Sequence, residues 1–100
     1  MTYKLKFFEE VKTDIIEAKD WYREKQDGLE IRFANSIKAA ILQIQKSPTS
    51  FSIRYKTIRI AHPKIFPFNI HFYLDDNAKT IIITAIVHNR RHPDIARKRI

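Results

Sequence analysis

The spacing of hydrophobic residues changes twice along this chain, near Glu9 and again at Pro48, and these changes limit the folds that it can adopt. The opening segment YKLKF, residues 3–7, alternates apolar and basic side chains, as a strand with one buried face does. From Glu9 the apolar residues recur at intervals of three and four, which predicts a helix with one buried stripe. The stripe consists of Phe8, Val11, Ile15, Ala18 and Tyr22.

The only glycine of the chain, Gly28, marks the end of this first helix. Glycine takes up left-handed backbone at little cost, so a tight reversal is expected here. A second helix follows and stops at Pro48, because proline disfavours helical backbone in the residue before it. Two amphipathic helices with a short join predict an antiparallel hairpin. The inner side of the second helix carries Leu29, Phe33, Ile37, Ala40, Ile41 and Ile44.

After Pro48 the chain reads as strands. In residues 53–62 apolar and polar side chains alternate, and the alternation is interrupted near Thr57 and Ile58. This interruption predicts a bulge or a bend between strand pieces. In residues 66–74 successive side chains alternate between an apolar face and a second face. Residues 80–88 are apolar on both faces, as in a central strand covered on two sides. The predicted order β-α-α-β-β-β gives an α+β fold, with the helical hairpin packed on a twisted, mostly antiparallel sheet and a basic C-terminal tail.

Length and composition set further limits. One hundred residues, 44% of them hydrophobic, fit a single domain over residues 1–100. The absence of cysteine excludes disulfides, thiolate nucleophiles and sulfur-ligated zinc, and a single glycine excludes a glycine-rich phosphate loop. No apolar run has the length of a membrane span and the first residues do not form a secretory signal, so we expect a cytoplasmic protein. No cofactor is expected.

The net charge of +8 is unevenly distributed. Residues 9–27 carry more acids than bases, so two blocks rich in Lys and Arg, residues 54–64 and 88–100, hold most of the surplus. If folding brings these blocks onto one concave face of the sheet, that face binds a polyanion. The alternative is that each base is an ordinary solvated residue that protects a sheet edge. The candidate anion-binding residues are Arg54, Lys56, Arg59, Arg90, Arg91 and Arg97.

The histidines offer several kinds of site. His88 ends a predicted strand and has a pKa range suited to general acid–base chemistry, although a strand-end histidine bonded to a backbone carbonyl is the simpler interpretation. His88 and His92 are four apart, but Pro93 argues against a helix and the neighbouring arginines repel a cation, so no metal site is expected. His62 reads as a loop residue, and His71 as part of a half-exposed sheet face.

Other polar and aromatic residues of the first helix have structural interpretations. Its seven acids alternate with bases at helical spacings, which favours a salt-bridged solvent face over paired catalytic carboxylates. Trp21 and Tyr22 are expected to pack against the core rather than stack on bases. The arginines of the tail are expected to border the working face, with residues 94–100 mobile until something binds them.

The order of elements and four segments resemble the toxins of the RelE/ParE superfamily, the small basic partners in bacterial type II toxin–antitoxin operons, also described as plasmid stabilisation proteins. The segments are FFEEVKTDIIEAKDWY, DGLEIRFANSIKAAILQIQKSP, KIFPFNIHFYLDD and IVHNRRHPDIARKR. The resemblance covers essentially the whole chain, and the Phe-Pro-Phe phrase at 66–68 with the His-x-Arg-Arg-x-Pro phrase at 88–93 is its most specific part.

The resemblance implies a partner and one of two activities. The partner is an antitoxin, usually acidic in its toxin-binding segment, which suits the basic charge of this chain. ParE-like toxins bind DNA gyrase and stall it on DNA. RelE-like toxins, or mRNA interferases, cut messenger RNA on the ribosome, where basic residues of the sheet stabilise the negative charge that develops as the ribose 2′-hydroxyl attacks the phosphate.

Two differences from RelE-like cleavers favour the ParE-like branch. The strand position where cleavers typically carry an arginine is Asn69 here, and no tyrosine follows Tyr73 in the C-terminal segment. In the cleaving alternative, the resemblance assigns catalysis to Arg90, with His88 and Arg59 as further candidates. A third possibility, a plain nucleic-acid-binding module, is supported only by charge and predicts affinity with a steep salt dependence.

Overall fold

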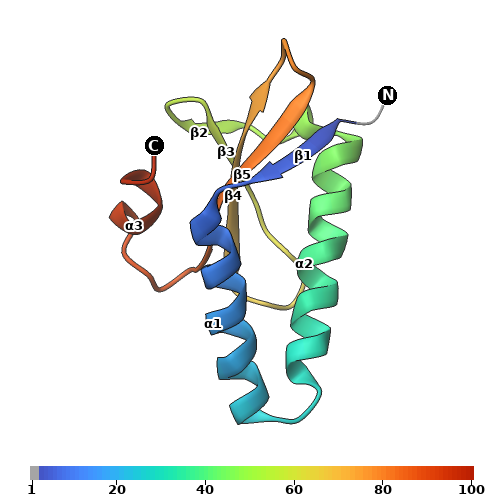
Figure 1. The fold of residues 1–100 in the computed structure, drawn as a ribbon, viewed down its shortest axis with the longest axis vertical. Helices are drawn as coiled ribbons and strands as arrows, with labels where there is room; N and C mark the ends of the chain where they lie inside the picture. Colours follow the sequence, from blue (N-terminus) through green and yellow to red (C-terminus); the bar gives the residue numbers. More distant parts are fainter. Residues whose placement is uncertain (1–2) are drawn as a thin grey trace.

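The computed structural model describes residues 3–100, which form five strands, two long helices and two short helical segments (Figure 1). The elements are β1 (Lys4–Phe7), α1 (Glu9–Lys25), α2 (Leu29–Lys46), the 3-10 turn η1 (Pro48–Ser50), β2 (Ile53–Tyr55), β3 (Ile58–Ala61), β4 (Phe68–Asp75), β5 (Thr80–His88) and α3 (Asp94–Arg97). None of these helices, within residues 3–100, has the length and apolarity to cross a membrane.

The five strands form one sheet in the order β1-β5-β4-β3-β2. All neighbouring strands are antiparallel except β1, which runs parallel to β5 from the pair Lys4 and Thr80 to the pair Phe7 and Ile83. The connection from β1 to its parallel neighbour β5 contains both long helices and the strands β2, β3 and β4. The predicted α+β fold of a helical hairpin on a mostly antiparallel sheet is confirmed.

The region after η1 contributes one strand more than the sequence pattern indicated. The predicted bend near Thr57 is a tight turn in which Lys56 has a φ of 47°, so β2 and β3 form a hairpin. The register also shifts between Ile53 and Tyr55. Both a bend and an irregularity are therefore present, and the sheet has five strands where four were expected.

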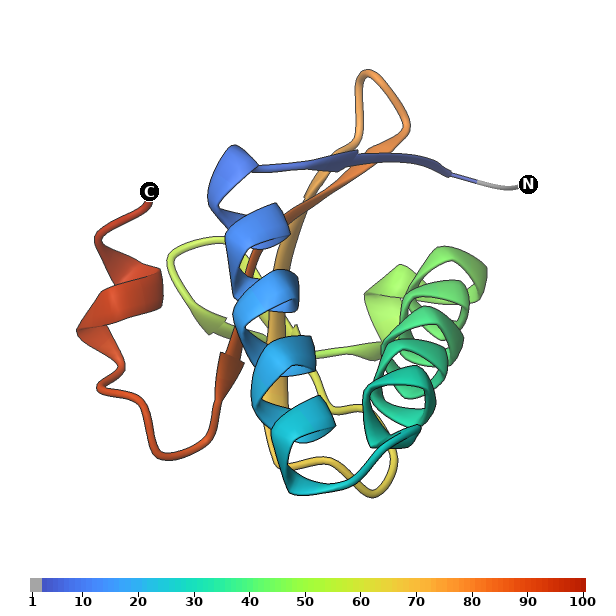
Figure 2. The same cartoon turned by 60° about the horizontal axis from the view of Figure 1, so that its bottom comes forward.

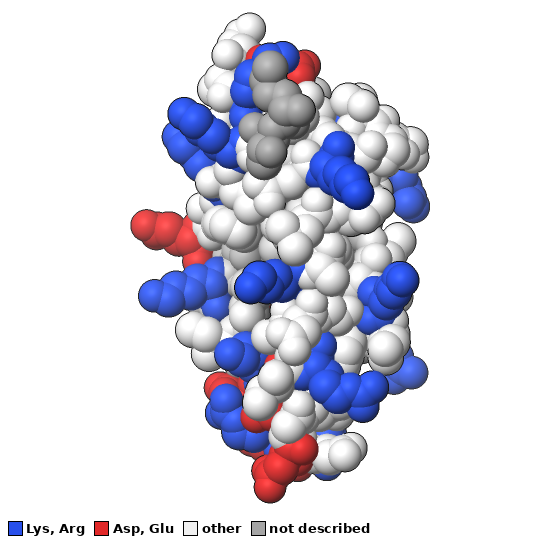
Figure 3. Space-filling view, turned by 90° about the vertical axis from the view of Figure 1, so that its right-hand side faces the viewer, with Lys and Arg blue, Asp and Glu red and all other residues white. Residues whose placement is uncertain are grey.

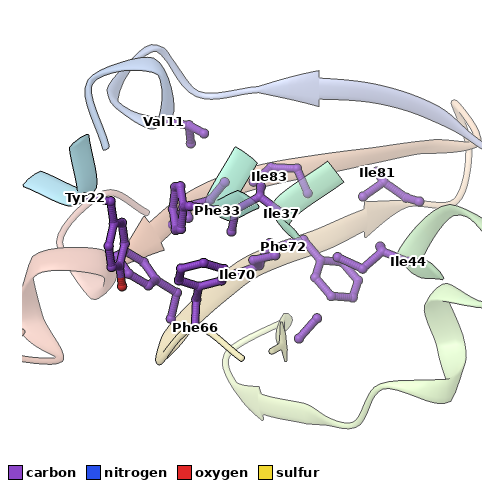
Figure 4. Packing of buried hydrophobic residues seen from close by; sticks show 13 residues of the cluster. Val11, Tyr22, Phe33, Ile37, Ile44, Phe66, Ile70, Phe72, Ile81 and Ile83 are labelled. Carbon is purple, nitrogen blue, oxygen red and sulfur yellow. The ribbon is translucent and has the colours of Figure 1, made fainter. Parts of the chain in front are cut away.

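The helical hairpin packs on one face of the sheet, which we call the helix face. Gly28, with a φ of 90°, joins α1 to α2 in left-handed backbone as predicted. Val11 and Tyr22 of α1 and Phe33 of α2 pack with residues of β4 and β5 such as Phe72 and Ile83 in the core (Figure 4). The predicted apolar stripes of both helices face this core or lie at its border.

The opposite face of the sheet is covered by the C-terminal segment, and we call it the α3 face. Ala96 of α3 is buried against Ala85 and Val87 of β5, with Ile95 beside them. β5 is thus covered on two sides, as its uniformly apolar sequence predicted. The expectation that residues 94–100 are mobile is wrong, because α3 packs on the sheet and Arg99 is held by an ion pair described below.

Candidate functional site

A hydrogen-bonded pair lies on the α3 face. Tyr55 is the last residue of β2, and its Oη lies 2.8 Å from Nδ1 of His71 in β4. His71 faces away from the helices because it alternates with Ile70 and Phe72, whose side chains enter the core. The two rings are also in edge contact, with centroids 5.8 Å apart.

Burial fixes the protonation state of His71. Only 6% of the residue is exposed, so the prediction of a half-exposed position is wrong. Desolvation, with smaller contributions from the charges of Arg99, Arg97, His62 and Arg54, lowers the pKa of His71 to about 4. The imidazole is therefore neutral at pH 7, and its Nδ1 is already occupied by Tyr55.

Cations from the middle of the chain and from its end meet around this pair. The guanidinium carbon of Arg97 lies 5.2 Å from the centre of the Tyr55 ring, a cation–π distance. Nζ of Lys56 donates a hydrogen bond of 3.2 Å to the backbone oxygen of Ile100. Burial raises the pKa of Tyr55 and the charge of Arg97 opposes that rise. Around this pair, Arg97 thus lies over the Tyr55 ring, Lys56 is bonded to the end of the chain, and the charge of Arg54 acts on His71.

An ion pair between Asp14 and Arg99 fastens the tail to the rest of the molecule. The two guanidinium nitrogens of Arg99 donate to the two carboxylate oxygens of Asp14 at 2.6 and 2.8 Å, and the side chains are only 13% and 10% exposed. Hydrogen bonding to Asp14 raises the pKa of Arg99. β1 ends at Phe7, beyond which the backbone edge of β5 lacks a strand partner. There the side chains of Asp14 and Arg99 bond the backbone of β5 in place of a strand. Asp14 accepts from the Ile86 N–H at 3.0 Å, and Arg99 donates to the Thr84 oxygen at 3.1 Å.

Arg59 does not join the other cations of its block. It pairs in register with Phe72, so its side chain lies on the helix face, where the guanidinium donates to the backbone oxygen of Phe51. The Arg59 guanidinium is therefore bonded to the protein backbone and is not presented to solvent with the other cations. The expectation that the two basic blocks meet on one face of the sheet is therefore wrong for Arg59.

Arg90 and Arg91 lie in a third place, at a groove between α1 and the end of β5. His88 beside them accepts a 3.0 Å hydrogen bond at Nδ1 from the Arg90 backbone N–H and packs edge-on against Phe68. His88 is thus bonded to the backbone, but its partner is an N–H and not the carbonyl that was expected. The three candidate catalytic residues Arg59, His88 and Arg90 are not assembled into one site.

Tyr55 and Asp14 belong to these sites although neither was predicted to. In the sequence, Tyr55 is one of several apolar residues of an alternating strand. Asp14 was counted among the solvent-facing acids, although it is spaced three residues from Val11 and four from Ala18, within the apolar stripe. An acid in that position predicts a buried partner. Trp21 was expected to pack against the core, but it is 52% exposed and lines the groove, whereas Tyr22 is buried.

Comparisons of sequence give no relative for this chain. No protein-family model matches it. No curated protein matches it either.

Comparisons of structure do identify the fold. A chain of the chromosomal ParDE TA system from P. aeruginosa matches with a TM-score of 0.74 at 18% identity, over 87% of this chain and 96% of that one. The toxin–antitoxin complex RelBE2 from Mycobacterium tuberculosis matches with a TM-score of 0.66 at 15% identity, over 89% and 100%. A double arginine-to-alanine mutant of E. coli toxin RelE in the free state matches with a TM-score of 0.66 at 14% identity, over 100% and 99%. The chain therefore has the RelE/ParE fold that the sequence resemblance implied.

Proposed function

We propose that this chain, which has the RelE/ParE fold, is the toxin of a type II toxin–antitoxin pair and acts in the ParE-like manner, by binding DNA gyrase and not by cutting RNA. An acidic antitoxin neutralises it. The fold, the net charge of +8 and the convergence of Arg54, Lys56 and Arg97 support a protein that binds a negatively charged surface.

The observation that carries the choice of branch is the closed state of the Tyr55 and His71 pair. A general acid or base must reach the proton that it transfers, within hydrogen-bond distance of the substrate. His71 is buried, neutral and bonded to Tyr55, and Arg97 of α3 lies over the Tyr55 ring. The Tyr55 and His71 pair therefore offers no free proton-transfer group, whereas the cations beside it are suited to binding.

RNA cleavage is the second candidate, and one observation favours it. Arg97 lies over the Tyr55 ring and the charge of Arg54 acts on the neighbouring His71, and cations in such positions stabilise the charge that develops on a phosphodiester. Cleavage requires the Tyr55 hydroxyl to leave His71, with which it is hydrogen-bonded, and α3 to uncover the Tyr55 ring, over which Arg97 lies.

The toxin assignment is tested by inducible expression in E. coli without an antitoxin. We expect growth to stop. Normal growth of cells that accumulate folded chain contradicts the assignment.

The branch is tested with chain made by cell-free translation, on gyrase supercoiling and on cleavage of ribosome-bound message in parallel. We expect loss of supercoiling and intact message, and weaker inhibition in the double variant Lys56→Ala, Arg97→Ala. The matched control is Arg32→Ala, Lys38→Ala on the exposed side of α2. Message cleavage that disappears in the Lys56 and Arg97 variant, with gyrase unaffected, selects the RelE-like candidate instead.

A further inference from the structure

The outer side of α2 forms a surface of its own, away from the α3 face. Figure 2 shows α2 and α3 on opposite sides of the molecule. None of the three cavities described on residues 3–100 is lined by a residue of α2, and an exposed helix is a convex surface. We call this side the α2 surface. It comprises the exposed residues Ile31, Arg32, Lys38, Leu42 and Lys46 of α2, with Lys64 and Ile65 of the loop between β3 and β4.

Three large aliphatic side chains of the α2 surface lie in water. Ile31 and Leu42 are 61% and 57% exposed, and they are about three helical turns apart, so both project from the same side of α2. Ile65 is almost fully exposed, and its loop is held beside α2 by the hydrogen bond of 2.6 Å from Ser36 to the Lys64 oxygen. One exposed aliphatic residue is ordinary on a protein surface, so the charges around this group decide its meaning.

The charges around these side chains are all positive. Residues 31–74 contain no Asp or Glu, and the one acid of α2, Glu30, is buried and bonded to Arg23 at 2.8 Å. The cations of the α2 surface are Arg32, Lys38, Lys46 and Lys64. None of the four forms an ion pair with another residue in 3–100. Figure 3 faces α2 and shows Lys and Arg spread over a mostly uncharged surface, with Asp and Glu toward its margins.

We propose that the α2 surface binds reversibly to membranes rich in anionic lipid, with Ile31, Leu42 and Ile65 entering the headgroup region and the four cations contacting lipid phosphates. Helices that lie on membranes combine exposed aliphatic residues with Lys and Arg in this way. The long stems of Lys and Arg keep their charges at the level of the phosphates while the aliphatic side chains reach deeper. The inference does not rest on the proposed function, because none of these residues belongs to the α3 face.

A nucleic acid fits the α2 surface less well. Its phosphates have a fixed spacing, and proteins that bind single strands stack the bases on aromatic side chains. The α2 surface has no aromatic residue, and aliphatic side chains stand between its cations. Lipid headgroups are separate molecules that move within the bilayer, so they adapt to cations at irregular spacing.

A protein partner fits less well for another reason. The buried centre of a protein interface is depleted in charged residues and is continuously apolar. On the α2 surface Lys38 lies about two helical turns after Ile31 and thus on the same side as Ile31 and Leu42. A flat protein surface therefore covers a lysine together with the aliphatic side chains, whereas a lipid headgroup region accommodates both.

The experiment measures co-sedimentation of the full chain, made by cell-free translation, with vesicles of phosphatidylcholine alone or with about one-third phosphatidylglycerol. We expect binding to the anionic vesicles only, and weaker binding at high salt. Arg32→Ala with Lys38→Ala should weaken binding about 20-fold, since each cation near an anionic leaflet contributes about 5-fold. The matched control, Arg90→Ala with Arg91→Ala, removes the same charge from exposed residues at the groove, and a loss of less than about 3-fold is expected.

Insertion is tested separately from charge. Leu42→Ser keeps the net charge and should weaken binding about 5-fold. Its control is Trp21→Ser, which removes an equally exposed side chain from the groove and should change binding less than about 2-fold. Trp21 is the only tryptophan of the chain, so Trp21→Phe with Leu42→Trp moves the reporter to the α2 surface. We expect its emission to shift to shorter wavelength on anionic vesicles, whereas the emission of Trp21 in the native chain stays unchanged.

Four outcomes overturn the inference: no binding to anionic vesicles, equal binding to both kinds of vesicle, equal losses in the α2 and groove variants, and a reporter at position 42 whose emission does not change. A DNA duplex that shifts this reporter as strongly as the vesicles do also overturns it. If Arg32→Ala with Lys38→Ala does not fold, Lys46→Ala with Lys64→Ala replaces it, with the same expected loss and the same control. None of these readouts involves growth or gyrase, so failure of the inference and failure of the proposed function are seen separately.

Discussion

Asp14 connects three elements that are far apart in the chain. It lies in α1, bonds the backbone of β5 through the Ile86 N–H, and holds Arg99 near the C-terminus. Both side chains of the ion pair are largely buried, so the loss of one partner leaves the other charge without water or a counter-ion. The loss of one partner of a buried ion pair lowers the free energy of unfolding far more than the loss of an exposed pair does.

We predict that Asp14→Asn lowers the free energy of unfolding by about 3 kcal/mol. Asparagine keeps the shape and an acceptor for the Ile86 N–H, but it removes the charge that Arg99 requires. Urea denaturation measures the change, and faster trypsin cleavage after Arg97 reports release of the tail. Asp20→Asn is the control, because Asp20 pairs with Arg23 at 3.3 Å in an exposed position, where about 0.5 kcal/mol is expected. Equal effects of the two substitutions contradict this account of Asp14.

His71 makes the stability of the chain depend on pH. Its pKa is about 4 in the folded chain and close to 6.5 when unfolded, so the unfolded chain binds more protons between these values. The contribution of His71 to stability is complete above pH 6.5 and is lost as the pH falls toward 4. The slope is at most about 1.4 kcal/mol per pH unit.

The substitution His71→Asn removes the titrating group and keeps a polar side chain near Tyr55. We predict that stability falls less steeply between pH 6.5 and 4.5 in this variant than in the native chain. Urea unfolding at a series of pH values measures both slopes. All other titrating groups are shared, so identical slopes mean that His71 is not the group responsible.

At the scale of elements, the connection between β3 and β4 holds an unusual turn. The Phe66 N–H donates to the Lys64 oxygen at 2.9 Å across Ile65, whose φ is 77°. This is the rarer and strained form of the γ-turn, and a β-branched residue is unfavourable there. Ser36 of α2 donates to the Lys64 oxygen at 2.6 Å, and Phe66 is buried, so packing on both sides of Ile65 enforces the turn.

We predict that Ile65→Gly raises the free energy of unfolding by about 1 kcal/mol, because relief of backbone strain exceeds the entropy cost of glycine. Ile65 is 82% exposed, so little packing is lost. The matched control is Ile31→Gly in α2, also an exposed isoleucine but with helical backbone, where a loss of about 1 kcal/mol is expected. Thermal unfolding distinguishes the two signs, and a loss in both variants argues against strain at Ile65.

The elements that the sequence predicted are those with a local signal. The apolar stripes of α1 and α2, the reversal at Gly28 and the two-sided burial of β5 follow from spacing along a few turns or one strand. The docking of α3 has no such signal, because its contacts involve Ala85 and Ala96, which are too small to produce a marked hydrophobic pattern. The pairing of β1 with β5 spans most of the chain and likewise leaves no local trace.

The candidate site was predictable only in part for the same reason. Composition located the two basic blocks, but the side of the sheet on which each base lies depends on register. A turn at Lys56 and a register shift in β2 place Arg59 on the helix face, apart from Arg54 and Lys56. The relation of Asp14 to Arg99 required knowledge of the path of the tail.

At the scale of the whole molecule, the six predicted anion-binding residues divide into three groups. Arg54, Lys56 and Arg97 lie at the α3 face, and Arg90 and Arg91 lie at the groove beside α1. Arg59 is bonded to the backbone on the helix face. Duplex DNA is a stiff rod, so only cations that share one face contact its phosphates together.

This division predicts the salt dependence of any DNA binding by the free chain. Each neutralised phosphate contributes about −0.9 to the slope of log K against log salt concentration, so the three cations of the α3 face give about −3, whereas all six acting together give about −5. Fluorescence anisotropy of a labelled 20-base-pair duplex between 50 and 200 mM salt measures the slope. We expect Lys56→Ala with Arg97→Ala to make the slope shallower by about 2, and Arg90→Ala with Arg91→Ala to leave it unchanged. A slope near −5 that responds equally to both double variants means that the cations form one surface in solution, which contradicts their division into three groups.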